Sequence, residues 1–183
     1  MTKLTDEVVF WEILQLANLD NTPYSVDKHV NQLERELSEL ADDDLLEFHQ
    51  WFHEKLQQAR TWEMWAAAWI TPDQNNAQGC GDDEFDDFCA GLVARGRTTF
   101  ESVVKEPDLV AEISNPELLK SGEGFINAAD RIYAKRHGQG SSIYYVLNTP
   151  LTVEPTGECW KETDRQYFVR KLPCALQKFG FPS

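Results

Sequence analysis

The chain has 183 residues, of which 42% are hydrophobic and 26% are charged, a composition typical of a globular protein. This length suits one domain with a sizeable core. No apolar run approaches the roughly 18 residues of a membrane span, so we expect no membrane association.

The negative charge is concentrated in the first half of the chain. The formal net charge is −14, and residues 1–91 carry 5 Lys and Arg against 20 Asp and Glu, whereas residues 92–183 carry 12 against 11. An acidic half repels phosphate backbones, so we expect no nucleic-acid partner. It would attract cations or steer a basic protein, and solubility alone is the other interpretation.

The N-terminus and the cysteines indicate a cytoplasmic protein. The opening "MTKLTDEVVFWEIL" places acids beside apolar residues and lacks the basic start of a signal peptide. The four cysteines form no C-x-x-C pair and no zinc-ribbon spacing. We therefore expect reduced thiols.

The first 70 residues predict four helices. Thr5 can cap a helix from Asp6 to about Ala17, and Ser25 can cap a second. The apolar stripe of the second helix is Val26, Val30, Leu33, Leu37 and Leu40. A third helix begins in "ADDD", and its inner face is Leu45, Phe48, Phe52 and Leu56. "TWEMWAAAWI" predicts a fourth, buried helix, whose tryptophan row favours core packing over stacking on a planar ligand.

The remainder of the chain predicts shorter helices. After a loop over 71–81, a helix runs from the acidic motif to Gly96, and further helical segments break near Pro107, end at Gly138 and break at Pro173. "SIYYVLNTPLTVEP" has a β-like pattern. We predict an all-α, single-domain multi-helix bundle over 1–183, with one small β-hairpin near residues 141–154.

Two histidines have the i, i+4 spacing of a helical metal pair. In "HQWFH", His49 lies within the apolar face of the third helix and His53 lies at its edge, while Gln50 occupies the position where a zincin motif has glutamate. We favour a semi-buried, satisfied pair over a metal site, because no third ligand is positioned by the sequence.

The motif "GCGDDEFDDFCAG" carries more acids than a helix cap needs. Its acids are Asp82, Asp83, Glu84, Asp86 and Asp87. One or two of them can cap the helix, and the rest repel one another. Carboxylates can also bind Ca²⁺ or Mg²⁺, but the spacing is not that of an EF-hand loop. The excess of about three carboxylates predicts an acidic binding patch.

The two cysteines of this motif have separate interpretations. Cys80 precedes a helix N-terminus, a position that can lower a thiol pKa, but the neighbouring carboxylates oppose a second negative charge. We therefore do not expect Cys80 to be a nucleophile. Cys89 lies on the apolar face of the helix and is predicted to pack in the core.

The order of the motifs resembles a known family. They are "FWEIL", "LLEFHQWFHEKL", "TWEMWAAAWI", "GCGDDEFDDFCAGLVARGR", "EPDLV", "PTGECWKETD" and "KLPCALQKFG". Together they are similar to DUF4240, an uncharacterised bacterial helical family, over about residues 10–180, most specifically over 62–97. The chain departs from the usual pattern at Gln78, Gly81, Glu84 and Cys89, where the family tends to have Gly, Ser, Gly and Arg. The resemblance implies a helical, cytoplasmic bacterial domain and supplies no activity.

Two functional hypotheses follow. No Ser-His-Asp order, P-loop or dinucleotide motif is present, so we favour a non-catalytic acidic interaction module, inhibitor-like or immunity-like, that binds a basic protein through the acidic motif and an exposed Trp51. No cofactor is then required. The alternative is a metal-dependent hydrolase or other small-molecule enzyme. Its divalent metal would be held by Asp82, Asp83 and Asp86 with His49 or His53. A structural domain without separable activity is a third interpretation, and the sequence predicts no oligomeric state.

Overall fold

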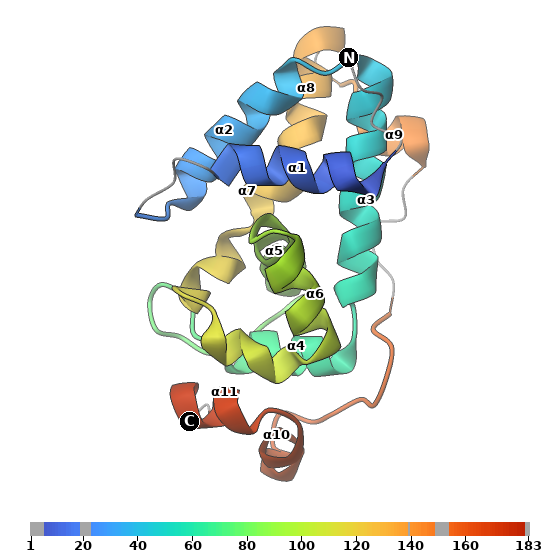
Figure 1. The fold of residues 1–183 in the computed structure, drawn as a ribbon. Coiled ribbons are helices and arrows are strands. Elements are labelled where there is room, and N and C mark those ends of the chain that lie inside the picture. The colour runs from blue at the N-terminus through green and yellow to red at the C-terminus, as the bar shows by residue number, and fades with distance from the viewer. Residues whose placement is uncertain (1–5, 19–22, 139, 149–153, 182–183) are drawn as a thin grey trace. The chain divides into compact units, whose positions relative to one another are not determined.

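The structure is a computed structural model, and it describes residues 6–18, 23–138, 140–148 and 154–181 (Figure 1). Helices follow one another through these residues and no β-strand occurs among them, so the all-α prediction is confirmed. An isolated parallel bridge joins Thr61 and Thr156. The chain forms two compact units, residues 1–55 with 123–152 and residues 56–122 with 153–183. The single domain over 1–183 stays a prediction.

The first unit is built on three long helices. They are α1 (Glu7–Asn18), α2 (Val26–Ser38) and the part of α3 (Asp42–Ala59) that precedes residue 56. Ser25 caps α2 as predicted, because its hydroxyl accepts a hydrogen bond from the Lys28 amide. The proposed Thr5 cap lies outside the described residues. In Figure 1, α1 crosses α3, and the Phe10 ring centroid of α1 lies 5.1 Å from that of Phe48 in α3.

Short helices complete the first unit. They are α7 (Glu123–Ile126), α8 (Ala128–His137) and α9 (Ile143–Leu147). Two salt bridges join α8 to α2, because the Glu34 carboxylate accepts both Arg131, at 2.6 Å, and Lys135, at 3.2 Å. Two predicted stripe positions of α2, Leu33 and Leu37, are fully buried.

The predicted β-hairpin near residues 141–154 is wrong where the structure describes that stretch. Residues 143–147 form helix α9, which Ser142 caps. The Ser142 hydroxyl donates to Asp130 Oδ1 at 2.8 Å, and the Ile143 amide donates to the same oxygen at 2.8 Å. This carboxylate of α8 fixes the first turn of α9, so a tertiary contact overrides the β-like pattern. Residues 149–153 lie outside the described residues.

The second unit surrounds two buried helices. Helix α4 (Trp62–Ile70) has three alanines, at 66–68, that are fully buried, and α5 (Asp82–Ala94) buries Phe85, Phe88 and Leu92 completely. Around them lie α6 (Arg97–Lys105), the 3₁₀ helices η1 (Pro107–Glu112) and η2 (Pro116–Ser121), α10 (Arg165–Lys171) and α11 (Pro173–Phe179). The breaks predicted at Pro107 and Pro173 therefore coincide with new helices that begin at these prolines.

Distant segments of the second unit are joined through backbone groups. The Trp62 amide donates to the Thr156 carbonyl at 2.9 Å, and the Thr156 amide donates to the Arg60 carbonyl at 3.1 Å. The buried Asp108 carboxylate accepts the amides of Cys174, at 3.0 Å, and Ala175, at 2.8 Å, and so caps α11 from η1. These contacts hold the C-terminal segment against α4 and η1.

Candidate functional site

The acidic motif forms the first turn and a half of α5. Gly81 is the N-cap, and the Glu84 carboxylate accepts a hydrogen bond from the Gly81 amide at 3.2 Å. This contact is the return half of a capping box. Glu84 therefore has a structural role in starting the helix.

Asp86 pairs with a buried cation. Its carboxylate accepts a hydrogen bond from the Arg60 guanidinium, which is only 7% exposed and lies 5.4 Å from the Phe85 ring centroid. A buried charge needs a counter-charge, because water no longer solvates it. Asp86 is therefore committed to holding Arg60 in the second unit.

Asp82 and Asp83 remain at the surface. Both are exposed, and neither forms a salt bridge within the described residues. Asp87 is half-buried, and its backbone carbonyl packs closely against Gly122. The excess of carboxylates is thus concentrated in the two residues that follow Gly81.

The loop that precedes these two aspartates is tied down at several points. The Asp73 carboxylate accepts the amides of Asn75 and Ala77, both at 2.8 Å. Lys120 donates to the Gly79 carbonyl, and the Trp65 indole donates to the Cys80 carbonyl at 2.9 Å. Side-chain and backbone contacts from α4 and η2 therefore fix where α5 begins.

Three aromatic rings stack beside this loop. The Trp62 and Trp65 ring centroids are 5.4 Å apart with planes at 6°, and the Trp65 and Phe85 centroids are 4.8 Å apart with planes at 11°. Trp69 lies in a separate cluster with Trp160 and Phe168. The tryptophan row thus serves packing at two places, in agreement with the core interpretation.

The thiols of the motif are protonated at neutral pH. Burial raises the pKa of Cys80 to about 12, and the carboxylates of Glu84, Asp87 and Asp82 act in the same direction, whereas the Lys120 ammonium opposes them. Burial, more than the nearby acids, therefore makes Cys80 a poor nucleophile. Cys89 is fully buried, as predicted, and burial raises its pKa further.

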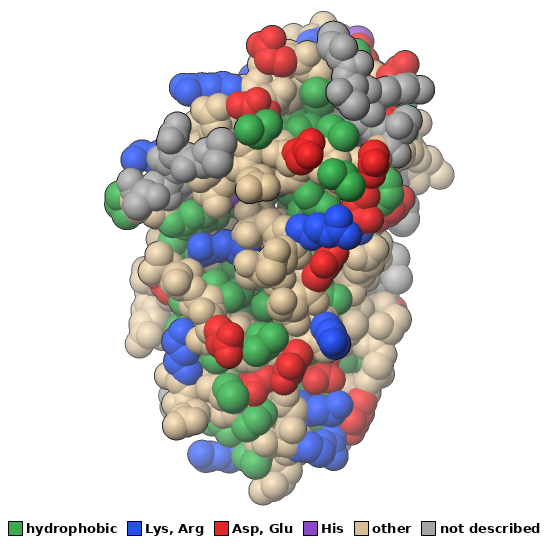
Figure 2. All heavy atoms as spheres, in the orientation of Figure 1, with side chains coloured by type: hydrophobic (Ala, Val, Ile, Leu, Met, Phe, Trp, Pro, Cys, Tyr) green, Lys and Arg blue, Asp and Glu red, His purple; other side chains and the backbone are tan. Residues whose placement is uncertain are grey.

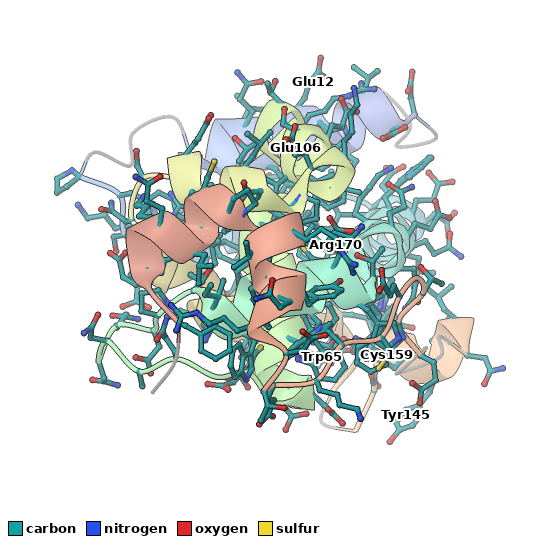
Figure 3. All side chains as sticks on the ribbon, turned by 90° about the horizontal axis from the view of Figure 1, so that it is seen from below. Glu12, Trp65, Glu106, Tyr145, Cys159 and Arg170 are labelled. Atoms are coloured by element: carbon teal, nitrogen blue, oxygen red, sulfur yellow. The ribbon has the colours of Figure 1, made fainter. Side chains whose placement is uncertain are left out.

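The other two cysteines lie at the surface of the second unit. Cys159 and Cys174 are both exposed, and all four cysteines are free thiols. Cys159 follows Glu158, whose carboxylate pairs with the exposed Arg170 guanidinium at 2.8 Å, and Figure 3 labels both Cys159 and Arg170. Within the part of the chain that the structure describes, neither cysteine belongs to a group of three or more candidate metal ligands.

His49 and His53 form a close pair in the first unit. Their ring centroids are 4.3 Å apart, and the Tyr144 ring of α9 stands nearly perpendicular to both, at 4.7 Å and 5.3 Å. Burial lowers the pKa of His49 to about 3, helped by the nearby His53, and lowers that of His53 to about 4. Both imidazoles are therefore neutral at pH 7.

The histidine pair and the acidic motif belong to different units, residues 1–55 and 56–122 respectively. Among the residues that the structure describes, no group of three or more His, Cys, Asp or Glu side chains is arranged to hold a metal ion. The shared histidine and aspartate site of the hydrolase hypothesis stays a prediction.

Trp51 is half-buried within its own unit. The Lys55 ammonium lies 5.5 Å from the Trp51 ring centroid and pairs with the Glu7 carboxylate at 2.7 Å. Lys55 itself is only 4% exposed. Trp51 was expected to be exposed, and it is instead half-buried, with the Lys55 ammonium over its ring in a cation–π contact.

Three residues of these sites were not singled out from the sequence. They are Arg60, Lys120 and Tyr144. Arg60 and Lys120 are separated from their partners Asp86 and Gly79 by 26 and 41 residues, and Tyr144 belongs to the stretch predicted as β-structure. Arg60 is one of 5 Lys and Arg residues among residues 1–91, and no signal in the sequence distinguishes it from the others as a buried counter-charge.

The fold and these features define an all-α protein whose charged motif starts a buried helix. A family model described as "Protein of unknown function (DUF4240)" matches residues 5–136, and the chain belongs to this family. The comparisons with curated proteins and with solved structures gave no match. No helix among the described residues is long and apolar enough to cross a membrane.

Proposed function

We propose that this chain is a non-catalytic acidic interaction module that binds a basic protein partner, in the manner of an inhibitor or immunity protein, in the bacterial cytoplasm. The observation that carries the proposal is which charged side chains form salt bridges within their unit and which do not. The buried cations Lys55 and Arg60 form salt bridges with acids of their own unit. Asp82 and Asp83, in contrast, are exposed and form no salt bridge within the described residues. Exposed carboxylates without internal partners are available to an external cation.

In the first unit, too, cations form salt bridges with some acids while other acids are exposed and have no salt bridge. Lys55 pairs with Glu7, Arg131 and Lys135 share Glu34, and Arg136 pairs with Asp42 at 2.7 Å. The exposed acids of this unit without a salt bridge in the described residues are Asp6, Glu12, Asp27, Glu39, Asp43, Glu54 and Glu123. In the view of Figure 2, acidic and basic side chains are interspersed over each unit. Selectivity would therefore come from local acidic positions rather than from one large negative face.

Rigidity supports the choice of Asp82 and Asp83 as the contact point. The loop before them is held by Trp65, Lys120 and the Asp73 turn, and α5 behind them is buried. A contact site that is ordered before binding loses less conformational entropy when the partner docks.

A labelled Arg- and Lys-rich peptide tests the proposal by fluorescence anisotropy at several salt concentrations. We expect Asp82→Asn/Asp83→Asn to weaken binding by about fivefold or more and to flatten its salt dependence, because two exposed carboxylates whose attraction is screened by salt are removed. The matched control is Glu106→Gln/Glu112→Gln, which removes the same charge from exposed positions of the same unit.

The control should bind the peptide within about twofold of the unmodified protein, because only the general field changes. Equal weakening by the two double variants would show that binding follows net charge alone. Binding that is insensitive to salt and to Asp82 and Asp83 would remove the basis of the proposal.

A further inference from the structure

We propose that His49 and His53 form a binding site for a first-row transition-metal ion of the Zn²⁺, Ni²⁺ and Cu²⁺ group. The site lies wholly within the first unit and is independent of the acidic motif. It concerns an ion-binding property, so it does not depend on the interaction function proposed above.

The pair is arranged on one face of α3. The i, i+4 spacing places the two imidazoles one helical turn apart, and their ring centroids are 4.3 Å apart. Tyr144 of α9 stands edge-on to both rings. Two side chains on one rigid helix, covered by a third, form a pre-positioned pair of nitrogen ligands.

Both histidines have a buried ring nitrogen without a partner. Nε2 of His49 and Nε2 of His53 are inaccessible to solvent and form no hydrogen bond within the described residues. His49 is 1% exposed. A buried polar atom without a partner is unfavourable, and one ligand shared by the two adjacent rings would satisfy both.

Another histidine of the same unit shows the ordinary arrangement. His29 is fully buried, and its Nδ1 lies 3.3 Å from the Tyr24 hydroxyl while its Nε2 lies 3.4 Å from the Leu14 carbonyl. The unit therefore satisfies both nitrogens where a histidine has a packing role only. His49 and His53 differ from His29 in this respect.

The chemistry of the two ligands selects the class of ion. Neutral imidazole suits Zn²⁺, Ni²⁺ and Cu²⁺, whereas Mg²⁺ and Ca²⁺ require oxygen ligands. Burial keeps both rings unprotonated at neutral pH, so no proton has to leave before an ion binds. Two protein ligands leave further coordination positions to water or another small ligand, so binding requires the cover over the two Nε2 atoms to open. A buried water bridging the two nitrogens is the competing explanation.

Calorimetric titration with Ni²⁺ and with Zn²⁺ tests the site. The background should be Cys159→Ser/Cys174→Ser, because these exposed thiols bind the same ions. We expect one ion per chain, no binding of Mg²⁺, and a loss of affinity of about tenfold or more in both His49→Gln and His53→Gln. The matched control, His137→Gln, removes an exposed histidine that contacts Asp42 and should retain the affinity.

A second measurement guards against variants that fail to fold. Cu²⁺ bound to the Cys159→Ser/Cys174→Ser background that also carries His137→Gln should give an electron paramagnetic resonance spectrum with coupling to imidazole nitrogens. Absence of Ni²⁺ and Zn²⁺ binding would overturn the proposal in favour of a bridging water. Binding that survives in folded His49→Gln and His53→Gln, or a copper spectrum without nitrogen coupling, would overturn it equally.

Discussion

Asp86 differs from its acidic neighbours because it faces a buried cation. Its carboxylate pairs with Arg60, whose guanidinium packs over the Phe85 ring, whereas Asp83 is exposed. Removing one member of a buried pair costs more than removing a surface charge, because the remaining charge loses its counter-charge. Asp83 and Asp86 belong to the same motif, but they therefore contribute differently to stability.

Asp86→Asn should lower the free energy of unfolding by about 1–3 kcal/mol, less than for a fully buried pair because Asp86 is partly exposed. Asp83→Asn removes the same charge and should change the free energy by at most about 0.5 kcal/mol. Urea unfolding of both variants followed by tryptophan fluorescence measures the difference. Equal destabilisation by the two substitutions would contradict the distinct role of Asp86.

At single residues, local roles could be predicted and distant partners could not. Ser25 caps α2 and Cys89 lies in the core, as local spacing indicates. Arg60 as the partner of Asp86, and Asp108 as the cap of α11 some 67 residues further on, are contacts between distant segments. No periodicity encodes such pairs, so the number of free acids in the motif could not be read from the sequence.

At the scale of elements, the approach of α5 to η2 depends on glycine. A Cβ at Gly91 would lie 2.3 Å from the Leu119 carbonyl oxygen, and one at Gly122 would lie 1.9 Å from the Asp87 carbonyl oxygen. Both distances are well inside van der Waals contact, and the obstacles are backbone atoms that cannot rotate away. The two segments can therefore pack this closely only without side chains at these positions.

Gly91→Ala should lower the free energy of unfolding by about 2 kcal/mol or more, because overpacking outweighs the usual gain of alanine in a helix. Gly81→Ala is the matched control, since a Cβ there meets no atom within 4 Å, and it should change stability by less than about 1 kcal/mol. Thermal unfolding by circular dichroism compares them. A stabilised Gly91→Ala variant would mean that η2 moves away at little cost.

Elements with strong local signals were predicted, and one with a misleading signal was not. The stripe and cap of α2 follow from side-chain spacing, and the breaks predicted at Pro107 and Pro173 follow from the fixed φ of proline, although the helices that begin at these prolines were not predicted. The stretch around Tyr144 is rich in aromatic and β-branched residues, yet it forms α9 because Asp130 binds its first turn. The first unit imposes that conformation through a contact outside the stretch.

For the whole molecule, stability should depend on pH in two separate ranges. Hydrogen bonds with Arg131 and Lys135 keep the pKa of Glu34 below its usual value despite partial burial, and a hydrogen bond with Arg136 lowers the pKa of Asp42. These carboxylates stabilise the fold above their ordinary pKa values, and the stabilisation is lost in acid. The net charge of −14 acts in the opposite direction there, because protonation relieves repulsion. Both effects are confined to pH values below about 5.

Between pH 7.5 and 5.5, the buried histidine pair should dominate the pH dependence. The folded pKa values of His49 and His53 are about 3 and about 4, against 6.5 in the unfolded chain, so the unfolded state takes up protons first as the pH falls. The stabilisation is complete above pH 6.5 and declines below it by up to about 1.4 kcal/mol per pH unit for each histidine. Urea unfolding at pH 7.5, 6.5 and 5.5, with a chelator present to exclude metal binding, measures this loss. His49→Gln/His53→Gln removes both titrating groups and should show a much flatter profile, whereas a slope as steep as that of the unmodified protein would place the titration elsewhere in the chain.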